Sequence, residues 1–207
     1  MMPNRIEPKL EPVALERLRP TQLTVGMCEV ARKQVEWRQR EEQDGPQFLG
    51  HHLLPAVLGP KHRLWIIDHH HLARALLETG VEHVLVTVVA RLQHLSKREF
   101  LTFMENRNWL HPYDEQGRRR DPDELPKTIG DMIDDPYRSL ASEVRRNGGF
   151  AKTDTPYSEF LWADFFRIRI SVSHLAKRHE RALCDAMELA RSRDASHLPG
   201  FAGGEED

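Results

Sequence analysis

The stretch WIIDHHHLARAL, residues 65–76, decides the fold that we expect for this chain. An apolar run ends in Asp68 and the histidines His69, His70 and His71, and an amphipathic segment rich in Ala and Leu follows. This change of pattern predicts a strand that ends near Asp68 and a helix that begins near His70. Because a helix N-terminus has unpaired N–H groups and a partial positive charge, the junction is suited to bind a phosphate or a carboxylate.

The composition gives no sign of a strongly charged or membrane-bound protein. The 207 residues include 30 Lys and Arg against 32 Asp and Glu, so the formal net charge is −2 and there is no global basic excess typical of nucleic-acid binding. Cys28 and Cys184 form no CxxC pattern, which favours reduced thiols. No apolar run is long enough to span a membrane and the first residues lack a signal-peptide core, so we expect a cytoplasmic protein without a membrane partner.

The N-terminal half alternates strand-like and helix-like patterns. Strands are expected at residues 13–18, 53–58, 63–68 and 84–89. Helices are expected at residues 27–39, from about 70 to 80, and after Ser96, with residues 41–50 as a loop. Ser96 and Glu99 have the spacing of a capping box, and Phe100, Phe103 and Met104 are expected to give the following helix its core face.

From about residue 110 the pattern becomes helical, and no further strand is predicted. Asp135-Pro136 and Thr155-Pro156 each have the form of a helix start, in which a capping residue precedes a proline. We therefore expect an α+β protein, with an α/β domain at residues 1–110 and an all-helical region at residues 111–207 packed on it.

Four segments carry a resemblance to a known family: LRPTQLTVG at residues 18–26, DHHHLARAL at 68–76, DDPYRSL at 134–140 and EFLWAD at 159–164. Together they resemble the ParB/sulfiredoxin superfamily and, within it, the family of ParB-like nucleases. The resemblance implies that residues 1–110 form a ParB/sulfiredoxin-like nucleotide-binding domain with a small mixed sheet, whose strand-end motif receives a nucleotide phosphate on the following helix.

Three activities of the superfamily bear on this chain. ParB proteins bind and hydrolyse CTP and spread on DNA, sulfiredoxins use ATP and a catalytic cysteine, and free-serine kinases carry an Asp-Gly-His-His-Arg-like motif. The stretch from Asp68 to His71 is most similar to the kinase motif, but His69 replaces its glycine and Leu72 its arginine, a loss for which Arg74 could substitute. The junction has no cysteine and no helix-turn-helix sequence is evident, which argues against sulfiredoxin chemistry and centromere binding.

The histidines at the junction are the first candidates for catalysis and phosphate binding. Neighbouring side chains diverge, so all three imidazoles cannot reach one ligand. We expect His70 and His71 to contact phosphate and transfer protons, with His69 as a further contact and Asp68 orienting an imidazole or holding Mg²⁺. The alternative is a solvated helix cap, and a zinc site with His51-His52 is a rival use, although contiguous histidines chelate poorly.

A second set of candidates lies on the expected first helix and in the turn before it. The resemblance implies that this region faces the nucleotide and supplies a catalytic glutamate. Glu29 is then a general base and Lys33 a phosphate contact, whereas their i,i+4 spacing also suits a surface ion pair. Thr21, Gln22 and Thr24 could donate hydrogen bonds to the ligand, or could cap the helix.

The leading functional hypothesis is a protein that binds a nucleoside triphosphate, ATP or CTP, with Mg²⁺, and catalyses phosphoryl transfer or hydrolysis; the phosphoryl acceptor is not identified. A DNA-interacting protein or nuclease is the alternative, in which the basic residues 118–120 would contact DNA. A third hypothesis is a non-catalytic interaction module whose helical half docks a partner or forms a homodimer. The basic residues Arg138, Arg145 and Arg146 are expected to organise a helix start and its exposed face.

Overall fold

The computed structural model describes residues 8–44 and 53–203. Its centre is a mixed five-stranded sheet in the order β1-β6-β4-β5-β2. The strands are β1 (Pro8–Ala14), β2 (Leu18–Pro20), β4 (Leu54–Gly59), β5 (Arg63–Ile66) and β6 (His83–Arg91). β4 runs antiparallel to β5 and parallel to β6, while β2 runs parallel to β5 and β1 antiparallel to β6. The expected small mixed sheet and the α+β class are confirmed.

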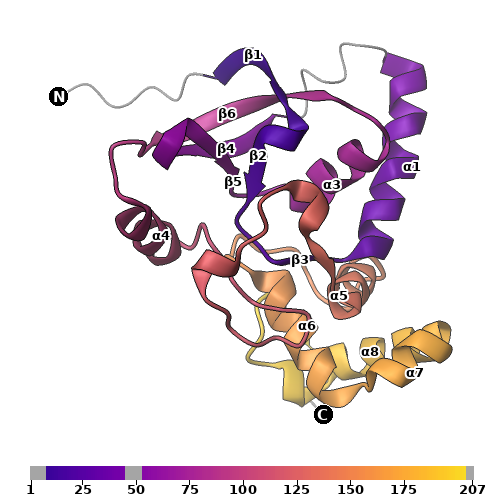
Figure 1. Cartoon of the computed structure of the whole chain (residues 1–207). Coiled ribbons are helices and arrows are strands. Elements are labelled where there is room, and N and C mark those ends of the chain that lie inside the picture. The colour runs from indigo at the N-terminus through magenta and orange to yellow at the C-terminus, as the bar shows by residue number, and fades with distance from the viewer. Residues whose placement is uncertain (1–7, 45–52, 204–207) are drawn as a thin grey trace.

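Helices cover both faces of the sheet (Figure 1). On one face, α1 (Met27–Asp44) and α3 (His70–Glu78) pack against inward side chains such as Ala56 and Ile66. On the other face, α4 (Lys97–Asn106) packs against Val57 and Trp65. Successive residues of a strand point to opposite faces, so each of these short strands contributes to two cores.

The C-terminal part of the chain forms a separate helical core below the sheet in Figure 1. Its helices are α5 (Pro136–Arg146), α6 (Ser158–Arg169), α7 (Val172–Lys177) and α8 (His179–Arg191). Tyr137 and Leu140 on α5 and Trp162 and Phe166 on α6 are buried in this core. By contrast, Leu125, Ile129 and Met132 pack into the cores around the sheet.

Several boundaries differ from those that the sequence predicts. The predicted strand at residues 13–18 is interrupted by a 3₁₀ turn at Leu15–Arg17, because Leu15 and Leu18, three residues apart, both point into the core. The first helix runs on to Asp44, past the predicted loop start at residue 41. A two-residue strand, β7 (Ile133–Asp134), pairs with β3 (Thr24–Val25), although no strand was expected after residue 110.

Two further expectations about the helices need correction. Phe103 is 39% exposed and packs edge-on against Trp109, so only Phe100 and Met104 of the expected core face are buried. α6 begins at Ser158, because Tyr157 takes a left-handed conformation and ends the turn that follows Thr155-Pro156. The capping box at Ser96 and the start at Asp135-Pro136 are confirmed. None of the described helices has both the length and the apolar character of a membrane span.

Candidate functional site

The predicted strand-to-helix junction is confirmed. β5 ends at Ile66 and α3 begins at His70, after His69 turns the chain with a left-handed φ of 61°. The backbone N–H of His69 donates to Asp68 Oδ1 at 2.6 Å, and the first hydrogen bond of the helix runs from Ala73 N to His69 O. Within the described part of the chain, the N–H groups at positions 70, 71 and 72 have no acceptor. The junction therefore presents the free amides that an anion requires.

His70 turns into the protein. Its side chain is buried, and its Nε2 accepts a hydrogen bond from the backbone N–H of Thr21 at 3.2 Å. The hydroxyl of Thr21 in turn donates to Ile66 O at 2.8 Å. Burial, with a contribution from the charge of Arg138, lowers the pKa of His70 to about 3. His70 is therefore a neutral imidazole that joins the turn after β2 to the end of β5.

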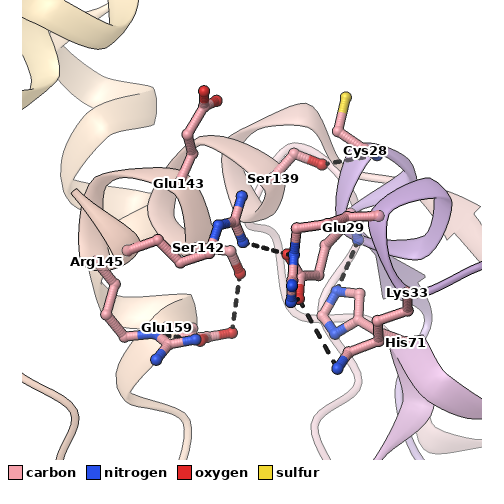
Figure 2. A network of polar contacts seen from close by, with 12 residues as sticks. Cys28, Glu29, Lys33, His71, Ser139, Ser142, Glu143, Arg145 and Glu159 are labelled. Atoms are coloured by element: carbon pink, nitrogen blue, oxygen red, sulfur yellow. Dashed lines mark hydrogen bonds and ion pairs between the residues drawn. The ribbon is translucent and has the colours of Figure 1, made fainter. Parts of the chain in front are cut away.

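His71 serves the neighbouring helix α1. Its Nε2 accepts from the backbone N–H of Gly26 at 3.0 Å (Figure 2). The next two amides of α1 are satisfied by Asp134 Oδ1, which accepts from Met27 N, and by Ser139 Oγ, which accepts from Cys28 N. Burial lowers the pKa of His71 well below its ordinary value, so this ring is also neutral. The N-terminus of α1 is thus closed by protein side chains, whereas that of α3 is open.

Glu29 is a buried carboxylate held by cations. Arg32 and Arg146 donate hydrogen bonds to it, and Lys33 Nζ lies 3.9 Å from its Oε1 (Figure 2). Burial raises the pKa of Glu29, but the hydrogen bond from Arg32 and the charges of Arg146, Arg32 and Lys33 outweigh it, so the pKa is lowered. Its role as a general base stays a prediction, and that role would require the carboxylate to leave these cations.

Arg138 is the principal residue that the sequence analysis assigned differently. Instead of lying on an exposed face of α5, it is 4% exposed and points into the space beside the junction. Its Nη1 donates to Gln22 Oε1 at 3.0 Å and to Thr24 O at 2.8 Å, and its guanidinium lies 3.7 Å from the ring centroid of Phe160. Its Nε has no partner, and no described carboxylate forms an ion pair with it. Burial lowers the pKa of Arg138 to about 10.

These groups line one pocket with a volume of about 680 Å³. Its walls are the junction at residues 67–72, the first turns of α1, the α5 residues Arg138 and Arg145, and the segment at residues 152–160. Of the lining cations, Arg145 pairs with Glu159 at 2.9 Å, whereas Lys152 has no ion pair among the residues that the structure describes. The pocket therefore lies between the sheet layers and the helical core, and each contributes charged groups to it.

The remaining predicted ligand contacts are divided between the pocket and the core. Gln22 lines the pocket and holds Arg138. Thr21 and Thr24 are buried behind its wall, and the Thr24 hydroxyl has no partner among the described residues. Arg74 turns away, because its Nη1 donates to the carbonyl oxygens of residues 129, 130 and 132 and its Nε to Glu78. A phosphate contact by Arg74 would require it to leave these four partners.

Two metal sites were considered from the sequence. Asp68 is exposed at the mouth of the pocket, and among the residues that the structure describes its Oδ1 is engaged by the His69 amide while its Oδ2 has no partner. The described residues contain no group of three or more His, Cys, Asp or Glu side chains placed to hold a metal ion. His51-His52, which a zinc site would need, lies outside the described residues.

The basic residues 118–120 lie away from the pocket, and acidic side chains neutralise them. The pairs are Arg118 with Asp114 at 3.1 Å, Arg119 with Glu105 at 2.6 Å and Arg120 with Glu124 at 2.5 Å. All three arginines remain at least 44% exposed. Because exposed ion pairs are weak, a polyanion could still compete for these cations.

Comparison with known proteins agrees with this architecture. The chain matches the family described as "Putative ParB-like nuclease" over residues 11–168. It is also similar to a solved structure, "Crystal structure of protein Atu1540 from Agrobacterium tumefaciens", with 50% sequence identity and a TM-score of 0.89. That match covers 96% of this chain and 99% of the other. No curated protein matches the chain.

Proposed function

The chain belongs to the family of ParB-like nucleases, and we propose that its pocket binds the phosphates of a nucleoside triphosphate, ATP or CTP, between the N-terminus of α3 and Arg138. The observation that carries this proposal is the buried guanidinium of Arg138, which forms no ion pair with a described carboxylate; Glu159 and Asp135 act on it only through space and pair with Arg145 and Arg167 instead. A buried charge without a counter-ion is costly, and a bound phosphate would supply the missing negative charge.

The surroundings of Arg138 suit a phosphate chain more than a single small anion. The amides at positions 70–72 present N–H donors, and Lys33 and Lys152 add positive charge along the pocket. The half-buried ring of Tyr157 gives the pocket an aromatic side chain, against which a nucleobase could stack, whereas Phe160 is buried beneath Arg138 and His111. A volume of about 680 Å³ lies within the range of small-molecule sites, which is about 300–1,000 Å³.

Mg²⁺ fits this site only as a partner of the phosphates. Mg²⁺ in nucleotide sites is commonly bound by one or two carboxylates together with phosphate oxygens, and Asp68 offers one carboxylate with an uncommitted oxygen. When bound, the ion would neutralise charge on the phosphates. The protein would contribute by positioning, with Arg138 fixing the phosphates and with His70 and His71 fixing the amides of α3 through their occupied Nε2 atoms.

The reaction class that we propose is phosphoryl transfer or nucleotide hydrolysis, and the acceptor is left open. The test is isothermal titration of the wild-type protein with ATP, CTP, inorganic triphosphate and adenosine, with and without Mg²⁺. Both nucleotides and triphosphate are expected to bind, whereas adenosine binds weakly. Arg138→Met should weaken binding by roughly 30-fold or more, and Arg118→Gln, which removes an equal charge from a site away from the pocket, should leave it unchanged. Wild-type protein that binds none of them at millimolar concentration would contradict the proposal.

The family description favours a second function, an interaction with DNA. In that case the cations at residues 118–120 would exchange their acidic partners for phosphates, with the usual loss of affinity at higher salt. Fluorescence anisotropy with a labelled duplex at 50 and 200 mM salt separates the two functions. Salt-sensitive binding that Arg118→Gln weakens and Arg138→Met does not would favour DNA. A protein whose melting temperature responds to neither ligand would be an interaction module.

A further inference from the structure

One wall of the pocket is a loop without regular secondary structure. Residues 152–157 connect the end of the α5 region to α6, and every one of them lines the pocket. Lys152, Asp154, Thr155 and Pro156 are exposed, so packing within the loop holds it only weakly. A loop that lines the pocket along its whole length must be positioned from outside if the pocket is to keep its shape.

The structure supplies this support from the far end of the chain. The backbone N–H of Ala151, directly before the loop, donates to Gly200 O at 2.7 Å. Phe150 and Phe201 form an antiparallel bridge beside it. After the loop, the indole Nε1 of Trp162 on α6 donates to Pro199 O at 2.8 Å. Both ends of the loop are therefore tied to one segment, residues 199–201, which we call the C-terminal brace.

Gly200 is the residue that allows this contact. Its φ is +77°, a left-handed value that favours glycine, and a Cβ at this position would lie 2.1 Å from Ala151 O. The same Cβ would lie 3.0 Å from Thr153 Cγ2, within the loop itself. Any side chain here would therefore push the brace away from the start of the loop.

We infer that the C-terminal brace is a positioning element of the pocket, and that it holds residues 152–157 in the conformation that receives the ligand. The brace lies beyond residues 11–168, the part that matches the family model, so the site depends on a segment outside that match. The part of this inference that concerns ligand affinity rests on the proposed function, whereas the part that concerns the order of the loop does not.

The chain offers a matched control for the test. Gly203 has a φ of +73° and no atom within 4 Å of a Cβ built on it, so Gly203→Ala imposes the same backbone strain without the contact. Amide hydrogen exchange at Ala151, Thr155 and Ser158 in the full-length protein is the first measurement, because the N–H groups of these residues in and beside the loop are hydrogen-bonded. We expect exchange to be at least fivefold faster in Gly200→Ala than in wild type, and within twofold of wild type in Gly203→Ala. Exchange in β4 and β6 should not change.

Affinity for inorganic triphosphate is the second measurement, and Gly200→Ala should weaken it at least fivefold. If Gly200→Ala does not fold, Trp162→Phe decides, because it keeps an aromatic ring against Phe150 and removes the donor to Pro199, although the smaller ring also leaves space where the buried indole packed. Unchanged loop exchange in the deciding variant would overturn the inference. If the wild-type protein does not bind triphosphate, the proposed function fails, while the exchange comparison still decides whether the brace orders the loop.

Discussion

Replacing Arg138 with methionine tests whether this residue is kept for ligand binding or for stability. Burial lowers the pKa of Arg138 to about 10, so the fold disfavours its charged form relative to the unfolded chain. At about 1.4 kcal/mol per pKa unit, keeping the guanidinium charged costs the fold on the order of 3 kcal/mol. This cost is present at neutral pH and disappears only as the pH rises above about 10 and the group loses its proton.

Methionine removes that cost and also removes favourable contacts. Its unbranched side chain can keep the packing on Phe160, but the hydrogen bonds to Gln22 Oε1 and Thr24 O are lost. Hydrogen bonds from a charged donor contribute about 1.5–3 kcal/mol each. The two effects largely cancel, so the free energy of unfolding of the ligand-free protein should fall by at most about 3 kcal/mol. Urea unfolding followed by circular dichroism measures this change.

The effect on binding should exceed the effect on folding. Truncating one member of a buried charge pair costs about 2–5 kcal/mol, which corresponds to a Kd for triphosphate weakened by roughly 30- to 5,000-fold. Arg138→Lys keeps the charge but loses the planar fork, so its Kd should lie between those of wild type and Arg138→Met. A Kd for Arg138→Met within threefold of wild type, measured by titration calorimetry, would refute the assignment of Arg138 to the ligand.

Three further substitutions test other buried features. The His111 ring is packed among aromatic rings, and burial and the charge of Arg138 lower its pKa to about 3. The neutral ring therefore contributes its full stability above its ordinary pKa near 6.5, and this contribution is lost as the pH falls towards 3. At pH 5 the lost stability is about 2 kcal/mol, which His111→Phe should restore; a thermal-melting series in which the variant has the same pH dependence as wild type would contradict this. Thr24→Val removes a buried hydroxyl without a described partner, so the free energy of unfolding in urea should rise by about 1 kcal/mol. A tenfold loss of triphosphate affinity in this variant would instead show that the Thr24 hydroxyl contacts the ligand. Gly26→Ala places a Cβ 2.6 Å from Ser139 Oγ, between α1 and α5. This overpacking should lower the free energy of unfolding by about 1–3 kcal/mol, and an unchanged midpoint of urea unfolding would contradict it.

Local interactions explain why much of the fold could be predicted from the sequence. The capping box at Ser96 and the proline start after Asp135 involve partners within three residues, so short patterns specify them. The junction at residue 68 follows from a change of hydrophobic period, which is also local. The errors arise where tertiary contacts decide: the pairing of β3 with β7 joins residues more than 100 positions apart, and neither segment has a strand-like pattern by itself.

The candidate site was harder to predict because its polar groups choose distant partners. The sequence places His70 and His71 at the junction, but it does not show that their Nε2 atoms accept from Thr21 and Gly26, which lie 49 and 45 residues away. Arg138 lies in the first turn of a helix whose start at Asp135-Pro136 was predicted, yet an arginine on a helix is usually solvated. The approach of α5 to the turn after β2, together with Phe160 on α6, buries it, and no local pattern encodes these contacts.

This division of roles among the histidines narrows where the proposed anion would bind. If His70 and His71 transferred protons through Nε2, each would have to release a backbone amide of the turn that leads from β2 into α1, and the wall that holds Arg138 would loosen. As neutral acceptors they instead fix the amides of α3 at one edge of the pocket, while α5 supplies the permanent charge at the other. An anion bound between them would contact both the sheet layers and the helical core, so binding should stabilise the two parts against separation as well as against unfolding.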